Sequence, residues 1–243
     1  MEVRTILFDF DSFHEYFNNN RVHALEKSMR VTPKKHRKPD PIFHYNNLCI
    51  TLHPEVYDPA EDTFLLLQSI KITSQDKILE LGTGCGLITL ECARRGAHVI
   101  STDINPFAIQ LTRRNIARNH HLLKGAIELR QGDLFSVLNH NELFHIIIFN
   151  PPYLPTTKKE RIGGWFDIAT DGGKNGLTVT HRFLQKLHAH LYPSGCAYFI
   201  FSTLSKRSTL EQYLKDGQLS SEIVARQRYN DEELDVYRVT PTA

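Results

Sequence analysis

The sequence has little of the material from which disulfide-bonded, metal-binding or membrane-spanning proteins are built. Its 243 residues include four cysteines, which are widely spaced and form no CxxC pair. Such scattered thiols indicate free cysteines in a reducing compartment and argue against a disulfide framework or a zinc site. No apolar run reaches the roughly 20 residues that a membrane-spanning helix needs, and the N-terminus carries acids where a signal peptide would be apolar. We therefore expect a cytoplasmic protein with no metal site and no membrane association.

An excess of charge of one sign is absent as well. The formal net charge at pH 7 is +2, from 29 basic and 27 acidic residues. This balance gives no general signature of a protein that binds polyanions, but it does not exclude nucleic acid as a partner. Two short basic runs, at residues 34–38 and 158–161, are typical of solvated surface and would serve a nucleic-acid interface if there were one.

What the sequence does have, from residue 77 onward, is a regular alternation of strand-like and helix-like segments. Short, nearly continuous apolar runs between amphipathic segments predict parallel strands with helices on both faces. These strand-like runs lie at residues 77–82, 98–104, 126–133, 144–150 and 196–203. Two further β-rich runs, at 222–229 and 234–240, flank a polar turn and predict an antiparallel hairpin. We expect a doubly wound, mostly parallel α/β sheet that ends in this hairpin.

The first part of the chain differs in character from the rest. Residues 1–45 are polar and include a basic stretch interrupted by prolines. Such a composition is typical of an extension or connector. We therefore predict an N-terminal extension and basic linker over residues 1–45 and one domain over residues 46–243.

A glycine loop joins the first predicted strand of this domain to its helix. Gly82, Gly84 and Gly86 let the backbone turn tightly and let a ligand approach closely. Their GxGxG spacing differs from the GxGxxG spacing of dinucleotide-binding proteins. Glu80, inside the end of the strand, would repel a pyrophosphate but attract an ammonium or sulfonium group. The loop therefore favours a cationic ligand over a dinucleotide.

Acids close the next two strands of the predicted sheet. Asp103 ends the second strand, where a carboxylate accepts the two hydroxyls of an adenosine ribose. Asp133 ends the third strand, where it is placed to accept the adenine amino group while Leu134 supplies a backbone N–H. Any one of these acids could be a helix cap, but three in successive strands beside a glycine loop indicate one binding site.

This pattern resembles the class I S-adenosylmethionine-dependent methyltransferases. The resemblance implies a seven-stranded Rossmann-like sheet and S-adenosyl-L-methionine as cofactor. It also implies that Glu80, Gly82 and Gly84 line the methionine part of the cofactor. By the same resemblance, Asp103 holds the ribose, and Asp133 with Leu134 holds the adenine edge.

The fourth strand of the sheet runs into the tetrapeptide Asn150-Pro151-Pro152-Tyr153, and the sequence predicts a long loop from there to about residue 176. Methylating a planar nitrogen is difficult because its lone pair is delocalised. The side-chain oxygen of Asn150 and the carbonyl of Pro151 can hold both N–H bonds of such a nitrogen, while Tyr153 packs against the flat target. We expect these three residues to be catalytic, and Asn150 to contact the cofactor as well. The tetrapeptide resembles that of the methyltransferases that act on adenine or guanine amines and on glutamine amides.

The stretch "VYDPAEDTFLLL", residues 56–67, bears on the choice between a nucleobase amine and a glutamine amide as substrate. On physical grounds alone, the acids at its centre indicate capping of a helix N-terminus. The stretch closely resembles the region before the glycine loop in the HemK2-type branch of the HemK/PrmC family, and residues 170–184 resemble a later family segment. The resemblance implies that Tyr57 and Thr63 contact the cofactor or close over it.

The same resemblance implies a substrate and a partner. The substrate is the glutamine of the GGQ motif in a class I translation release factor, and the partner is a small, separate, zinc-binding activator subunit. Methylation of adenine N6 or guanine N2 in RNA or DNA stays open as an alternative, and so does methylation of a protein lysine.

Overall fold

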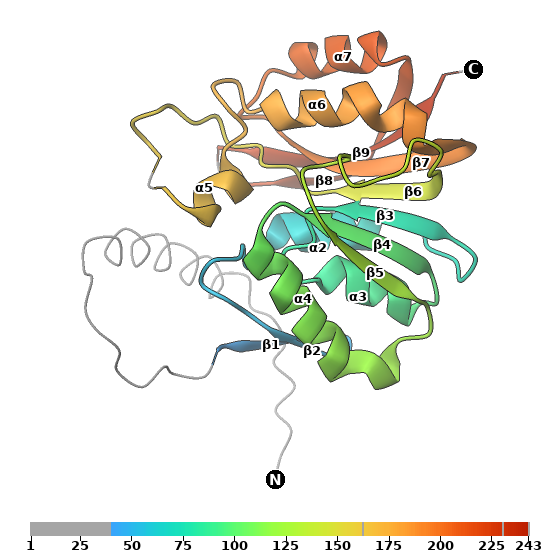
Figure 1. Ribbon diagram of the computed structural model, residues 1–243. Coiled ribbons are helices and arrows are strands. Elements are labelled where there is room, and N and C mark those ends of the chain that lie inside the picture. The colour runs from blue at the N-terminus through green and yellow to red at the C-terminus, as the bar shows by residue number, and fades with distance from the viewer. Residues whose placement is uncertain (1–39, 162, 230, 243) are drawn as a thin grey trace. The chain divides into compact units, whose positions relative to one another are not determined.

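The computed structural model describes residues 40–161, 163–229 and 231–242 (Figure 1). Residues 1–39, which make up most of the predicted N-terminal extension, lie outside this part. No helix among the described residues is long and apolar enough to cross a membrane.

A sheet of seven strands forms the centre of the described chain (Figure 1). Its strands are β3 (Lys77–Leu81), β4 (His98–Asp103), β5 (Ile127–Gln131), β6 (Phe144–Phe149), β7 (Leu191–Ser202), β8 (Leu219–Arg228) and β9 (Glu233–Pro241). They lie in the order β5-β4-β3-β6-β7-β9-β8. The first five are parallel, whereas β9 runs antiparallel to both β7 and β8. The predicted Rossmann-like sheet with a C-terminal antiparallel hairpin is confirmed.

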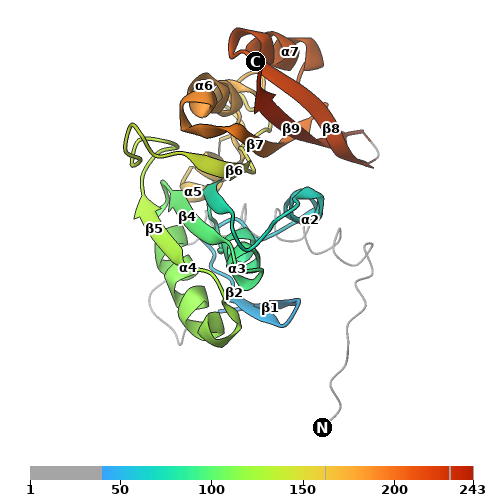
Figure 2. The same cartoon turned by 90° about the vertical axis from the view of Figure 1, so that its right-hand side faces the viewer.

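Helices cover both faces of this sheet (Figures 1 and 2). The described helices are α2 (Glu61–Ser69), α3 (Leu87–Arg94), α4 (Pro106–Asn119), α5 (Trp165–Thr170), α6 (Thr178–Leu187) and α7 (Arg207–Asp216). Short 3-10 turns follow α4 and α6 at His120–Leu122 and His188–His190. Apolar side chains of α2, α3 and α4 pack on one face, and those of α6 and α7 pack on the other.

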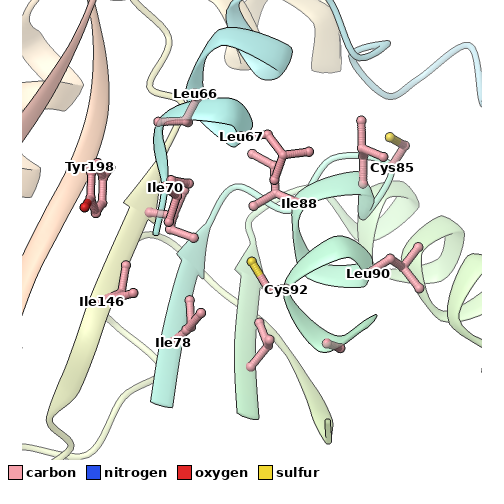
Figure 3. Close-up of a cluster of buried hydrophobic side chains, with 14 of the residues drawn as sticks. Leu66, Leu67, Ile70, Ile78, Cys85, Ile88, Leu90, Cys92, Ile146 and Tyr198 are labelled. Carbon is pink, nitrogen blue, oxygen red and sulfur yellow. The ribbon is translucent and has the colours of Figure 1, made fainter. Parts of the chain in front are cut away.

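Alternation along the strands explains why both faces are buried. Successive side chains of a strand point to opposite faces, so Ile78 packs against α2 and α3 while Leu79 packs on the α6 side. Figure 3 shows the first of these clusters, where Leu67 and Ile88 come from the helices and Ile78 from the sheet. Burial on both faces is the reason that the strands read as almost continuous apolar runs.

The order of the strands reverses between β3 and β6. The chain runs outward from β3 to β5 and then returns to form β6 on the other side of β3. Leu81 pairs with Phe149, so Gly82 and Asn150 follow two neighbouring strand ends. In open α/β sheets, ligands bind at this kind of switch point, beyond the carboxyl ends of the strands.

An antiparallel hairpin of β1 (Ile42–Tyr45) and β2 (Leu48–Thr51) precedes the sheet. The hairpin crosses the domain boundary predicted between residues 45 and 46, so the described residues before that boundary pair with residues after it. The role of the N-terminal extension stays a prediction.

Asn115 of α4 links this hairpin to the glycine loop through hydrogen bonds. Its side-chain oxygen accepts the Thr51 N–H at 2.9 Å, and its amide donates to the carbonyls of Thr51 at 3.0 Å and Cys85 at 2.8 Å. Because Asn115 is fully buried, its loss leaves three backbone groups without a partner. We expect Asn115→Ala to lower the free energy of unfolding by about 2 to 4 kcal/mol. Urea denaturation measures this, with exposed Arg113→Ala as a control that changes it by less than about 0.5 kcal/mol; an equal effect of the two variants would contradict the account.

Two segments differ from the prediction. Helix α5 lies within the stretch expected to be a long loop, and its six residues are too few for a helical periodicity to show. Strand β7 begins at Leu191 instead of residue 196. The extra residues enter the sheet through a register shift against β6, between Phe144 and Ile146, and such an irregularity leaves no pattern in the sequence.

Candidate active site

The glycine loop after β3 has a backbone that favours glycine. Gly82, Gly84 and Gly86 have φ values of 72°, 54° and 86°. A Cβ atom at Gly86 would lie 2.7 Å from the Thr112 side chain. The Gly84 N–H donates to the Asp103 carboxylate at 2.9 Å, which joins the loop to the end of β4.

Glu80 lies beneath this loop with 2% of its surface exposed. Its Oε2 atom accepts hydrogen bonds from Thr83 at 3.3 Å, from Ser101 at 3.0 Å and from Thr89. Burial raises the pKa of Glu80 to about 8, although the three hydroxyls oppose this shift. Glu80 is therefore mostly protonated at pH 7, and a cation placed beside it would favour its charged form.

Asp103 is held at the end of β4 by backbone donors. One carboxylate oxygen accepts the Gly84 N–H, and the other accepts the Asn105 N–H at 2.8 Å. Burial raises the pKa of Asp103, and the backbone hydrogen bonds work against this. Because each carboxylate oxygen has two lone pairs, both can still accept a hydroxyl.

Asp133 and Leu134 follow β5 at the same edge of the sheet. Leu134 has a positive φ of 49°, which turns the backbone just after the acid. The Asp133 carboxylate pairs with Arg182 of α6 at 2.5 Å. This pairing was not predicted, because 49 residues separate the two in the sequence.

Asn150 follows β6 and has a fixed orientation. Its Nδ2 atom donates to the Asp62 carboxylate at 3.0 Å. Its Oδ1 atom is buried and has no hydrogen-bond partner among the described residues. The bond to Asp62 therefore leaves the amide oxygen of Asn150 as a ready acceptor.

Asp62, in the first turn of α2, accepts hydrogen bonds from two residues of the tetrapeptide. The carboxylate oxygen that accepts Asn150 also accepts the hydroxyls of Tyr153 at 3.1 Å and Tyr57 at 3.4 Å. Its second oxygen accepts the Thr63 N–H at 2.6 Å. Burial and the nearby charge of Asp62 raise the pKa of Tyr153 and of Tyr57, so both stay protonated donors.

The sequence has informative relatives. The methyltransferase small domain family matches residues 54–164. A putative protein N5-glutamine methyltransferase from Methanocaldococcus jannaschii is 37% identical over 196 residues, which are 80% of this chain and 96% of the relative. The human methyltransferase HEMK2 is 29% identical over 195 residues, 76% of this chain and 90% of the relative. The chain belongs to the HemK family of methyltransferases.

A solved structure has the same fold as this HemK-family chain. It is the Mtq2–Trm112 complex of E. cuniculi, described as responsible for methylating the translation termination factor eRF1. The TM-score is 0.57 at 24% identity, covering 77% of this chain and 99% of the other. The chain is therefore a methyltransferase of the S-adenosyl-L-methionine-dependent kind.

The fold of the HemK-family chain gathers the predicted site residues at one edge of the sheet. Tyr57, Asn150 and Tyr153 share Asp62, and Gly84 is bonded to Asp103. The Thr63 hydroxyl instead lies within the start of α2, near Asp62 and the Ala60 N–H. The roles assigned to these residues stay predictions.

Sequence reasoning missed the position of Asp62. It lies within the family-like stretch at residues 56–67, but an acid in the first turn of a helix reads as ordinary capping. Its contact with Asn150 spans 88 residues. Only the resemblance of the surrounding stretch could have drawn attention to it. Among the described residues, no group of three or more histidine, cysteine or acidic side chains could hold a metal ion.

Proposed function

We propose that this enzyme methylates the side-chain amide nitrogen of a glutamine in a translation release factor. The observation that carries the proposal is the Asn150 amide, which Asp62 orients with its oxygen buried and unpartnered. An acceptor fixed in this way suits a donor N–H of a planar amide. The name of the M. jannaschii relative supports glutamine as the class of substrate, and the description of the Mtq2–Trm112 complex supports a termination factor.

The residues at the switch point fit S-adenosyl-L-methionine. Glu80 offers a carboxylate beneath glycines that would let the methionine part approach, and both oxygens of Asp103 keep lone pairs for ribose hydroxyls. We further assign Asp133 and the Leu134 N–H to the adenine edge. When bound there, the cofactor supplies an electrophilic methyl group on sulfur.

Tyr57 and Thr63 belong to the segment that closes over this site. Tyr57 is tied to Asp62 through its hydroxyl, so its ring is held beside the tetrapeptide. Thr63 acts through the start of α2, whose first turn positions the Asp62 carboxylate.

The chain's own residues prepare the glutamine nitrogen for transfer. Asn150 Oδ1 accepts one N–H of the amide, and the Pro151 carbonyl accepts the other. Two acceptors of this kind favour a pyramidal nitrogen, whose lone pair is then available. The nitrogen would take up the methyl group that the cofactor supplies and would lose one proton to solvent, because Asn150 Oδ1 and the Pro151 carbonyl accept hydrogen bonds but take up no proton. Preorganised dipoles, and no strong base, provide the catalysis.

Cofactor binding will depend on pH through Glu80. Burial raises the pKa of Glu80 to about 8 in the free enzyme, and the ammonium of the cofactor lowers it by favouring the carboxylate. Binding therefore releases a proton near pH 7, and affinity rises between pH 6 and 8 before levelling off. Calorimetry in buffers of different ionisation enthalpy measures this proton. Glu80→Gln removes the proton release, and an unchanged release in that variant would contradict the assignment.

The same buried acid affects folding of the free enzyme. Because the pKa of Glu80 is raised above its usual 4.5 to about 8, its contribution to stability is complete below pH 4.5 and is lost as the pH rises through 8. Cofactor binding compensates for this loss at alkaline pH.

A partner subunit belongs to the same proposal. The solved Mtq2 structure contains Trm112 as a second protein, and we propose that a small separate subunit, of the zinc-binding kind, activates this chain too. Co-purification and activity with and without such a subunit test this part.

Labelled S-adenosyl-L-methionine tests the substrate. We expect label to enter a release factor that carries GGQ, and not a release factor in which this glutamine is replaced by alanine. Equal labelling of both proteins would refute the proposed glutamine.

A further inference from the structure

Buried polar atoms without a hydrogen-bond partner indicate a second part of the site. Four buried side-chain polar atoms have no hydrogen-bond partner within the described ranges: Thr102 Oγ1, Asn150 Oδ1, Ser205 Oγ and Glu232 Oε1. Thr102 lies inside β4, but the other three follow β6, follow β7 and precede β9. Leaving such an atom unpaired costs about 1 to 3 kcal/mol. The carboxyl edge of the sheet therefore has acceptors prepared for something that the chain itself does not supply.

Strand register places Glu232 at this edge. Ser202, the last residue of β7, pairs with Leu234 of β9. The two strands are also joined by the Thr203 N–H, which donates to the Glu233 carbonyl at 3.0 Å, and by the Glu233 N–H, which donates to the Thr203 hydroxyl at 2.8 Å. Glu232 thus stands just beyond the end of β7, and β7 is the neighbour of the strand that carries Asn150.

The hairpin of β8 and β9 also approaches α2. Both strands contact α2, and Figure 2 shows the end of β8 and the start of β9 on the same side of the molecule as α2. Helix α2 carries Asp62, to which Asn150 and Tyr153 are bonded. Glu232 therefore lies beside the candidate active site, on the side of the hairpin.

The electrostatics agree with this placement. The charge of Glu232 contributes to raising the pKa of Tyr153. In turn, burial and, to a smaller extent, the charge of Asp62 raise the pKa of Glu232, while a hydrogen bond with Ser202 lowers it. Glu232 is thus close enough to Asp62 for the charge of Asp62 to act on it, and its Oε1 atom has no hydrogen-bond partner among the described residues.

A peptide substrate offers a donor that fits this acceptor. In the proposed function Asn150 holds the target nitrogen, so a second acceptor beside this site, on the side of the hairpin, meets the residues next to the target glutamine. Those residues present main-chain N–H groups, and a carboxylate oxygen accepts such a group strongly. We propose that Glu232 accepts a hydrogen bond from a main-chain N–H of the protein substrate next to the target glutamine. This inference rests on the proposed function and adds a substrate-positioning residue to it.

This role is tested by comparing the effects of Glu232 variants on KM with their effects on kcat. We expect Glu232→Ala to raise KM for the release factor about tenfold, to change kcat less than about threefold and to leave the Kd for S-adenosyl-homocysteine unchanged. Glu232→Gln keeps an acceptor oxygen, so its KM stays within about threefold of wild type. The matched control is Glu233→Gln, because Glu233 pairs instead with Arg226 and Arg228, and it should not raise KM.

Several outcomes overturn the inference. An unchanged KM in Glu232→Ala would do so, as would an equal loss of cofactor affinity, which would indicate a structural role only. If Glu232→Gln were as impaired as Glu232→Ala, the substrate would require the negative charge, and a cationic side chain would replace the main-chain donor.

Ester substitution in the substrate identifies the donor. In peptides spanning the GGQ motif, an ester oxygen replaces one main-chain N–H at a time. At one position beside the glutamine, we expect the ester to lower kcat/KM about tenfold with wild type and less than twofold with Glu232→Ala. If the ester lowered kcat/KM by the same factor with wild type and with Glu232→Ala at every position, the two changes would be independent, and the contact would be refuted. Absence of glutamine methylation by wild type would instead refute the proposed function, so the two failures are distinguishable.

Discussion

Asn150→Ala will lower kcat for methyl transfer by about a hundred- to a thousandfold, while the Kd for S-adenosyl-L-methionine stays within about threefold of wild type. The substitution removes an acceptor that is already oriented and unpartnered in the free protein. Removing one preorganised polar group of this kind from an active site costs about two to three orders of magnitude in rate. Single-turnover kinetics with labelled cofactor measures the rate, and calorimetry measures the affinity.

A matched variant should show the opposite pattern. We assign Asp103 to the cofactor, and both of its carboxylate oxygens are fixed by backbone donors. Asp103→Ala should therefore weaken cofactor binding first and reduce kcat less at saturating cofactor. If Asn150→Ala weakened cofactor binding as much as Asp103→Ala did, the assignment of Asn150 to the transferred nitrogen would be wrong.

Asp62→Asn will lower kcat by about a hundredfold, although Asp62 need not touch the substrate. One carboxylate oxygen of Asp62 accepts Asn150 and the two tyrosine hydroxyls. An asparagine at this position has a single oxygen and an NH2 group, so it cannot accept at both former carboxylate oxygens. When its NH2 group faces Asn150, two donors oppose each other, and the Asn150 amide turns its own oxygen away from the substrate.

The near isosteric change keeps the volume of this buried side chain, so the fold is retained. Initial rates with the release factor measure the loss. The control is Glu61→Gln, one residue earlier in the same turn, which should retain more than half of the activity. A fully active Asp62→Asn enzyme would show that Asp62 serves only to cap α2.

The fold could be predicted because each strand carries its own signal. Runs such as residues 146–149 are apolar throughout, since both faces of the sheet are covered. The polar turn between 222–229 and 234–240 identified the reversed strand. Parallel strands end at the same edge, so acids such as Asp103 could be placed near the glycine loop without coordinates.

Long-range side-chain contacts could not be predicted in this way. The bond from Asn150 to Asp62 depends on where the first turn of α2 lies relative to the residue after β6, and no local pattern encodes that. The pairing of Asp133 with Arg182 and the position of Glu232 beside the site likewise follow from strand order and helix position. Helix α5 was missed because six residues give too short a pattern.

Locating the transferred methyl group tests the central claim most directly. The enzyme, with its activator subunit if one is required, is incubated with labelled S-adenosyl-L-methionine and an equimolar mixture of release factor and RNA. Tandem mass spectrometry then assigns the labelled residue. We predict methylation at the amide nitrogen of the GGQ glutamine, lost with Asn150→Ala. Label on an adenine, a guanine or a lysine, with none on the glutamine, would contradict the account.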